Sequence, residues 1–195
     1  MSTTIKTSRI VMPGDRFAGL SVLLLTLLAL AAGWLLKTTV ENRSLAFKSG
    51  TISAQAPAGW LSLQPIGNEV LHVTDRTSKG FGTAYLIQVE AVSADAQAGQ
   101  VVSLVTLERG SALTGYRVLK QQEVLVQGRK AIEIDYVYVE SASNLNHVVL
   151  PSVVRGLDYI FVNAGQAIIV SYRADQSVYD ADLGRFQRFL VSVKN

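Results

Sequence analysis

The chain has 195 residues, 49% of them hydrophobic, which is enough for one ordinary domain with a buried core plus an appendage. It contains no cysteine, which excludes disulfide bridges, thiolate metal sites, thiol catalysis and a lipidated cysteine anchor. Residues 37–195 hold 15 Lys and Arg against 14 Asp and Glu without a basic cluster, so nucleic acid is not an expected partner.

The first predicted element is a membrane-spanning helix from Phe17 to Leu36. Its 20 residues include no charge, and at a rise of ~1.5 Å per residue they span about 30 Å, the thickness of a bilayer's hydrocarbon core. The segment is apolar on every side, whereas a helix of a soluble domain keeps one polar face. We therefore expect it to insert into the bilayer as an anchor. Small side chains that permit close packing against another subunit's helix stand at Ala18, Ser21, Ala29 and Ala32.

A cleaved signal peptide is the alternative interpretation of this segment. Ala29-Leu30-Ala31 has the small-x-small pattern of a cleavage site, but the apolar run continues to Leu36 and exceeds an ordinary h-region of about 7–15 residues. Three basic residues stand on each side of the helix, so the positive-inside rule does not decide the orientation. The short tail, residues 1–16, is typical of a signal anchor. It predicts a cell-membrane protein with a cytoplasmic N-terminus and an extracytoplasmic, periplasmic-type domain.

The extracytoplasmic part is predicted to comprise a linker, residues 37–44, and one domain, residues 45–195. The first expected strand covers residues 51–56, with Ile52, Ala54 and Ala56 on its inner face, and ends at Pro57-Ala58-Gly59-Trp60. After it we expect an exposed loop over residues 74–82 and a strand over residues 84–92. The inner face of that strand is predicted to consist of Ile87, Val89 and Ala91.

An amphipathic helix is expected between Ser93 and Leu113, fraying by Gly110, with Ser93 or Asp95 capping its first turn. The residues at helical spacing that predict its inner face are Val101, Leu104, Val105 and Leu107. A hairpin follows, with strands over residues 117–126 and 131–140 joined by residues 127–130. One face of its second strand should carry Ile132, Ile134, Tyr136 and Tyr138, and the opposite face Glu133 and Asp135.

Further strands are predicted over residues 148–162, with an edge or bulge at Pro151, and over residues 167–173, after a polar loop at 141–147 and a turn at 163–166. The chain closes with a helix whose apolar residues step by four and three: Tyr179, Leu183, Phe186, Leu190 and Val193. This order predicts an α+β class, an antiparallel β-sheet flanked by helices after one N-terminal transmembrane helix.

Three short segments resemble the PsbP and Mog-type fold family over the whole predicted domain. They are Pro57-Ala58-Gly59-Trp60 after the first strand, Gly128-Arg129-Lys130-Ala131 leading into a strand, and Gly165-Gln166 before the last strand. The resemblance implies an α+β sandwich and a non-enzymatic binding or assembly role, because PsbP supports a photosystem and the Mog branch binds a small GTPase. The N-terminal membrane helix departs from PsbP, which is a peripheral protein.

The sequence contains no motif that indicates a catalytic, metal or cofactor site. His72 and His147 are isolated, and a zinc site needs several ligands close together. There is no Gly-x-Ser-x-Gly elbow, and Gly80-Phe81-Gly82 lacks the Gly-Lys-Ser/Thr ending of a P-loop. The carboxylates that could suggest calcium are better explained as charges at a helix start marked by Ser177-x-x-Asp180: Asp175, Asp180 and Asp182.

Four aromatic residues on neighbouring predicted strands could form a ligand platform or a partner surface, although aromatic residues on strands more often lie in the core: Tyr136, Tyr138, Tyr159 and Phe161. The leading hypothesis is therefore a non-enzymatic accessory or scaffolding subunit of a membrane complex, with other integral membrane subunits as partners. The alternative is an anchored domain that binds a small molecule or lipid between sheet and helix. A hydrolase is not expected, because no nucleophile and base pair can be named.

Overall fold

The computed structural model describes residues 13–41, 43–78, 81–141, 143–144, 147–148, 151–163 and 165–195. The chain divides into two compact units, Met1–Arg43 and Ser44–Asn195. In the first, helix α1 covers Pro13–Glu41 and is longer than the predicted span at both ends, so most of the segment 37–44 is helical. Within it, Phe17–Thr39 is long and apolar enough to cross a membrane.

The polar side chains inside the apolar part of α1 have their hydroxyls satisfied within the helix. Ser21 donates to the carbonyl of Phe17 and Thr26 donates to that of Val22, each at 2.9 Å. Every polar group needs an internal partner in hydrocarbon, where water cannot serve. The hydroxyls of this helix therefore meet that requirement.

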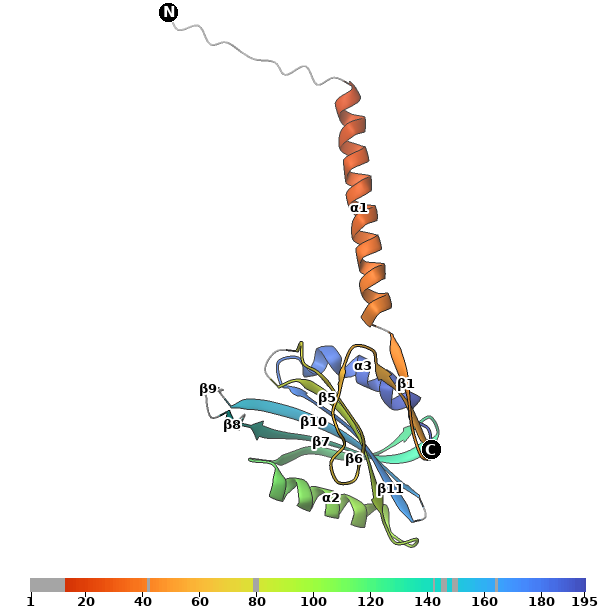
Figure 1. Cartoon of the computed structure of the whole chain (residues 1–195), viewed down its shortest axis with the longest axis vertical. Helices are drawn as coiled ribbons and strands as arrows, with labels where there is room; N and C mark the ends of the chain where they lie inside the picture. Colours follow the sequence, from red (N-terminus) through yellow and green to blue (C-terminus); the bar gives the residue numbers. More distant parts are fainter. Residues whose placement is uncertain are drawn as a thin grey trace, which may run out of the picture. The chain divides into compact units, whose positions relative to one another are not determined.

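The second unit is an α+β domain, which confirms the predicted class. Its elements are β1 (Ser44–Ser49), β2 (Ile52–Pro57), β3 (Leu61–Ser62), β4 (Glu69–Asp75), β5 (Thr83–Ala91), α2 (Ala98–Ala112), β6 (Arg117–Val126), β7 (Arg129–Glu140), β8 (Ser143–Asn144), β9 (His147–Val148), β10 (Ser152–Asn163), β11 (Gln166–Asp175) and α3 (Tyr179–Ser192). Seven strands form an antiparallel sheet in the order β3-β4-β5-β11-β10-β7-β6, and β1 pairs with β2. Helices α2 and α3 lie on opposite faces of the large sheet (Figure 1).

The predicted hairpin of β6 and β7 is present and has a tighter turn than expected. Only Gln127 and Gly128 connect the strands, with φ angles of 51° and 76°. Two successive positive φ values are characteristic of a two-residue type I′ turn, whose twist matches that of the strands. The β10–β11 hairpin is also present. However, β10 lies between β7 and β11, so Pro151 precedes a central strand and the edge prediction is wrong.

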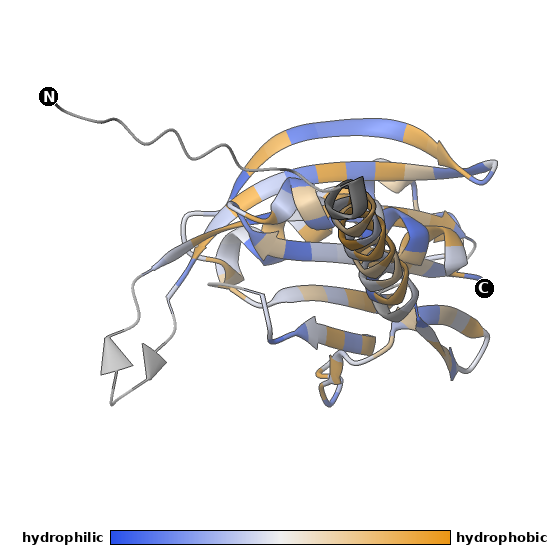
Figure 2. Ribbon diagram, turned by 90° about the horizontal axis from the view of Figure 1, so that it is seen from above, coloured by the Kyte–Doolittle hydropathy of each residue, from blue (hydrophilic) through white to orange (hydrophobic). Residues whose placement is uncertain are grey.

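Hydrophilic and hydrophobic residues alternate along several ribbons of the second unit (Figure 2), whereas the central strands are buried on both faces, as Ile168, Ile169 and Val170 of β11 are. The core on the α3 face includes Tyr85, Tyr172 and Phe186. The core on the α2 face is the predicted set of β7 with residues of β10, β11 and α2. Because Tyr136 and Tyr138 belong to the second core while Tyr159 and Phe161 belong to the first, the four aromatic residues do not form one platform.

Helix α2 buries two of the four residues predicted for its inner face, Val101 and Val105, and the other two predictions are wrong. Its buried residues are Val101, Val102, Val105 and Arg109, whereas Leu104 and Leu107 are exposed. Its N-cap is Gln97, whose backbone N–H donates to the Gln100 side chain, and Ser93 instead donates to the Asp95 carboxylate. The helix also continues past Gly110. Two stripes of residues at helical spacing overlap on this helix and share Val101 and Val105. The buried stripe continues to Arg109, and because that residue is charged the sequence pattern favoured the other stripe.

Smaller differences concern the ends of other elements. Ala91 is exposed because it lies at the end of β5, where the core no longer reaches. The N-cap of α3 is Val178 and not Ser177, whose hydroxyl donates to Asp175 at 2.7 Å. Phe189 joins the predicted buried residues of α3. Strands β1 and β4 were not predicted, and the short pair β8 and β9 lies where a polar loop was expected.

Candidate functional site: a pocket beside the end of helix α2

The α2 face of the sheet is hollowed beside the C-terminal end of that helix. A pocket of about 330 Å³ lies over β4, β5, β11 and β7, next to Leu113, the C-cap of α2. Its apolar lining is Leu63, Phe81, Gly82, Ala84, Leu86 and Leu113, and its polar lining is His72, Thr74, Tyr138, Glu140 and Arg173. The rings of Phe81 and Tyr138 meet edge to face, with centroids 6.4 Å apart. An apolar cavity with a few converging polar groups is the usual form of a small-molecule site.

Arg173 projects from β11 into this part of the sheet. Its Nε atom is buried and has no hydrogen-bond partner within the described ranges. Burial acts to lower the pKa of its guanidinium, but the oxygens of Tyr136 and Tyr138 and the Asp158 carboxylate outweigh burial, so the pKa is raised and the group stays cationic. The arginine ion pairs among the described residues involve Arg109, Arg155 and Arg185, not Arg173. The pocket therefore borders a cation without a paired carboxylate.

A second cation, Arg109 of α2, is paired under the helix. Its Nε lies 2.6 Å from Oδ2 of Asp158, whose side chain is fully buried. Its Nη2 donates to the hydroxyl of Ser171 at 3.2 Å and to the side-chain oxygen of Gln88 at 3.3 Å. Burial acts to lower the pKa of Arg109, but Asp158 together with the oxygens of Tyr136 and Tyr116 outweighs burial, so the pKa is raised. This ion pair joins α2 to the centre of the sheet.

Gly156 leaves space for the ring of Tyr136, whose hydroxyl contacts the buried Asp158. In the strand register it lies opposite Arg173 on β11 and opposite Tyr136 on β7. A Cβ at this position would be 2.2 Å from Cζ of Tyr136, so the ring occupies the space over the glycine. The Tyr136 hydroxyl donates to Oδ1 of Asp158 at 3.2 Å. Burial raises the pKa of Tyr136, and it raises that of Tyr116 to about 12, so both phenols are neutral donors at ordinary pH.

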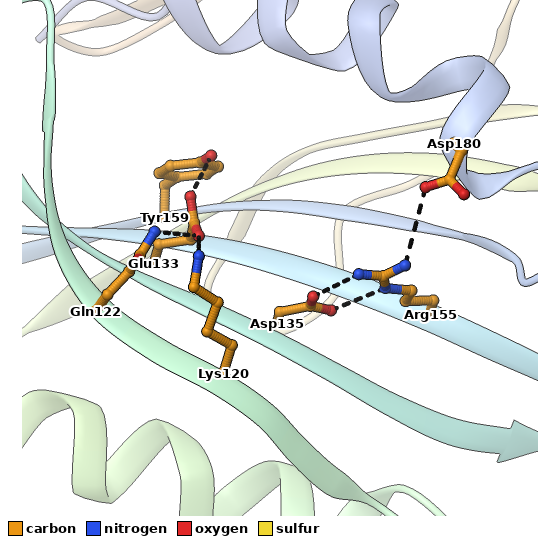
Figure 3. A network of polar contacts seen from close by, with 7 residues as sticks. All are labelled: Lys120, Gln122, Glu133, Asp135, Arg155, Tyr159 and Asp180. Atoms are coloured by element: carbon orange, nitrogen blue, oxygen red, sulfur yellow. Dashed lines mark hydrogen bonds and ion pairs between the residues drawn. The ribbon is translucent and has the colours of Figure 1, made fainter.

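The opposite face carries a separate polar network over β6, β7 and β10 (Figure 3). Arg155 binds both carboxylate oxygens of Asp135, at 3.0 and 2.6 Å, and lies 3.8 Å from Asp180 of α3. Glu133 accepts hydrogen bonds from Tyr159 at 2.8 Å and Gln122 at 2.9 Å. Each carboxylate already has partners, and this network joins strands and helix. We assign it a structural role.

A surface beside the edge strand β6 is apolar and open. Leu107 of α2 and Leu125 of β6 are each 71% exposed. Leu107 borders a groove of about 750 Å³ between α2 and β6, and Leu125 borders a groove of about 530 Å³ near the β6–β7 turn. We call Leu107, Leu125 and these two grooves the β6-edge surface. Large exposed apolar residues beside grooves are typical of interaction sites.

The residues singled out in the sequence are not brought together. His72 is half-buried on β4 and contacts Glu69 at 3.2 Å, whereas His147 belongs to β9 and its side chain lies outside the described residues, as does Gly80. Asp180 and Asp182 occupy the first turn of α3 as predicted, while Asp175 accepts bonds from the Ser177 backbone and hydroxyl. Within the described residues, no three His, Asp or Glu side chains form a group that could hold a metal ion.

The polar residues of the site were not predicted. Arg109 follows Val101 and Val105 at steps of four, so an arginine that continues an apolar stripe could have indicated a buried charge. Asp158 stands between Leu157 and Tyr159 in an apolar run, which is a similar signal. Their pairing depends on the strand order and on where α2 crosses the sheet.

No protein-family model and no curated protein sequence matches the chain. Several solved structures do resemble it. Cyanobacterial PsbP (CyanoP) from Synechocystis sp. PCC 6803 is 11% identical with a TM-score of 0.58, covering 78% of this chain and 92% of its own. LpqN of Mycobacterium tuberculosis, involved in cell envelope biogenesis, is 11% identical with a TM-score of 0.52, covering 78% and 91%. The Ran-binding protein Mog1p of Saccharomyces cerevisiae is 10% identical with a TM-score of 0.48, covering 77% and 94%. The chain thus has a PsbP/Mog-like α+β fold, as its sequence resemblance implied, together with an N-terminal apolar helix.

Proposed function

We propose that this chain is a non-enzymatic, membrane-anchored accessory or scaffolding subunit of a larger membrane protein complex. The observation that carries the proposal is the union of the apolar helix Phe17–Thr39 with a PsbP/Mog-like domain in one chain. A tether confines the domain to the membrane surface and raises its effective concentration there, so a weak docking surface suffices. The helix inserts in the cell membrane with a cytoplasmic N-terminus, and the domain docks on the extracytoplasmic side.

The β6-edge surface is the docking surface that we assign to the extramembrane part of an integral membrane partner. Strand β6 ends the seven-stranded sheet and is paired on one side only, with β7. A partner that covers Leu107 and Leu125 buries apolar area there, and such area drives most protein association. The tether supports a membrane protein as the occupant, because partners in the same bilayer meet the domain at high local concentration.

Copurification from native membranes in mild detergent tests the proposal. The tagged full-length chain is expected to recover a defined integral membrane protein, and Leu107→Gln with Leu125→Gln is expected to reduce recovery at least tenfold, because central apolar contacts dominate interface energies. The matched control is Ile66→Gln, which replaces a residue that is 78% exposed in the loop between β3 and β4 and should leave recovery unchanged. Recovery of only the bare monomer, or equal loss in the control, would contradict the proposal.

A second candidate function is the binding of a small molecule by the anchored domain. It is favoured by the pocket beside α2, in which Arg173, Thr74 and Tyr138 converge among apolar side chains. The two functions are compatible, because the pocket is lined by β4, β5, β11 and β7 residues and the β6-edge surface by α2, β6 and β7 residues near the hairpin turn.

A further inference from the structure

The pocket beside α2 has space and lining for a compact organic ligand. Its volume of about 330 Å³ lies at the lower end of the range of ~300–1,000 Å³ that is usual for small-molecule sites. Leu63, Leu86 and Leu113 supply aliphatic walls, and Phe81 and Tyr138 supply aromatic ones. A ligand that enters this space should therefore place an apolar body against these walls.

Arg173 is the cation of the pocket lining and Glu140 is its carboxylate; among the described residues no ion pair joins the two. Asp158 is fully buried, and Arg109 already holds it at 2.6 Å. Arg173 is the second cation: its side chain is hydrogen-bonded to Tyr136, and its buried Nε has no hydrogen-bond partner in the part of the chain that the structure describes. A guanidinium removed from water and not fully hydrogen-bonded is unfavourable, and an anion in the pocket relieves that cost.

The geometry of the donors selects the anion. A planar guanidinium binds a carboxylate through two parallel hydrogen bonds. Thr74 and Tyr138 line the same space and can add hydroxyl donors. Glu140 also lines the pocket and disfavours a second negative charge on the ligand. We propose that this pocket binds a small monocarboxylate, with Arg173 on the carboxylate and the leucine and aromatic side chains around its apolar body.

This inference rests on the second candidate function and specifies its ligand class. It does not depend on the docking of a membrane partner. The carboxylate can come from a soluble metabolite or from the free end of a fatty acid, since both present the same group on an apolar body.

The test uses the full-length chain in lipid nanodiscs and ¹⁹F NMR of two probes, 3-(4-fluorophenyl)propionate and its primary amide. We expect the acid to bind and the amide to bind at least about tenfold more weakly, because only the acid forms charge-assisted hydrogen bonds. Equal binding of the two probes would overturn the carboxylate inference and leave small-molecule binding intact. No binding of either would overturn both.

Three variants locate the site. Arg173→Gln is expected to weaken binding of the acid at least about tenfold, whereas Arg117→Gln, which replaces an exposed arginine of β6, should leave it unchanged. Glu140→Gln removes the opposing charge and should tighten binding, which keeps the test decisive if Arg173→Gln does not fold, as judged by circular dichroism. Unchanged affinity in both pocket variants would overturn the assignment.

A competition experiment distinguishes the two sources of the carboxylate. Displacement of the probe by hexadecanoate in the nanodisc identifies a lipid source, and lack of displacement identifies a soluble one. Both outcomes support a carboxylate site.

Discussion

Replacing Asp158 with alanine is expected to lower the free energy of unfolding by about 3–5 kcal/mol, the cost of removing one partner from a buried ion pair. The Asp158 side chain is 0% exposed and its partner Arg109 is only 8% exposed. Without the carboxylate, the guanidinium would remain buried without a counter-charge, and Tyr136 would lose the acceptor of its hydroxyl. Guanidinium chloride unfolding of the full chain in detergent, followed by circular dichroism, measures the change.

Two comparisons separate this explanation from a general effect of removing a carboxylate. Asp180→Ala breaks an ion pair of 3.8 Å on a side chain that is 88% exposed, and should cost less than about 1 kcal/mol. The double variant Arg109→Met with Asp158→Leu removes both charges and should be more stable than Asp158→Ala alone, because no unpaired charge stays buried. If Asp158→Ala is no more harmful than Asp180→Ala, the ion pair does not hold α2 on the sheet.

Substituting alanine for Gly156 is expected to destabilise the domain by about 1–3 kcal/mol or more through overpacking. Local propensity alone predicts the opposite sign, since glycine inside a strand is usually less favourable than alanine. At this position the new Cβ would be 2.2 Å from Cζ and 2.6 Å from Oη of Tyr136. The ring cannot move away freely, because Tyr136 is fully buried and hydrogen-bonded to Asp158. Whether Gly156→Ala stabilises or destabilises the domain therefore shows how tightly the Tyr136 ring packs against this position.

Gly184 provides the matched control for that substitution. It lies inside helix α3, and a Cβ there would have no neighbour within 4 Å. Gly184→Ala should therefore stabilise the domain by about 0.5–1 kcal/mol. Thermal unfolding of the two variants side by side gives the comparison. A neutral or stabilising effect of Gly156→Ala would show that the Tyr136 ring has another place to go.

Much of the fold could be predicted from short-range patterns in the sequence. The alternation from Ile132 to Tyr138 and the turn at Gly128 specify a half-buried strand in a hairpin, because both signals depend on neighbouring residues only. Strand β4 was missed because the alternation of Leu71, His72, Val73 and Thr74 is short: it is broken on one side by Val70, where the strand register shifts, and on the other by Asp75. Helix α2 was found, but its buried face depends on what it packs against.

The candidate site depends on long-range pairing, which the sequence does not reveal. Asp158 comes opposite Ser171 through the register of β10 and β11, and Arg109 reaches both only because α2 crosses that part of the sheet. A shift of one residue in the register would turn each strand over and separate these groups. Arg173 is likewise an ordinary polar residue of a strand until the neighbouring Gly156 and Tyr136 are placed.

Fractionation with intact-mass measurement decides whether α1 remains attached to the domain and holds it in the membrane. Membranes containing the native chain are washed with alkaline carbonate, and the chain is then weighed by mass spectrometry. We expect the chain to stay in the membrane pellet and its mass to include Phe17 to Leu36. A soluble chain that begins after Ala31 would contradict it, because the domain would then have no tether to the bilayer.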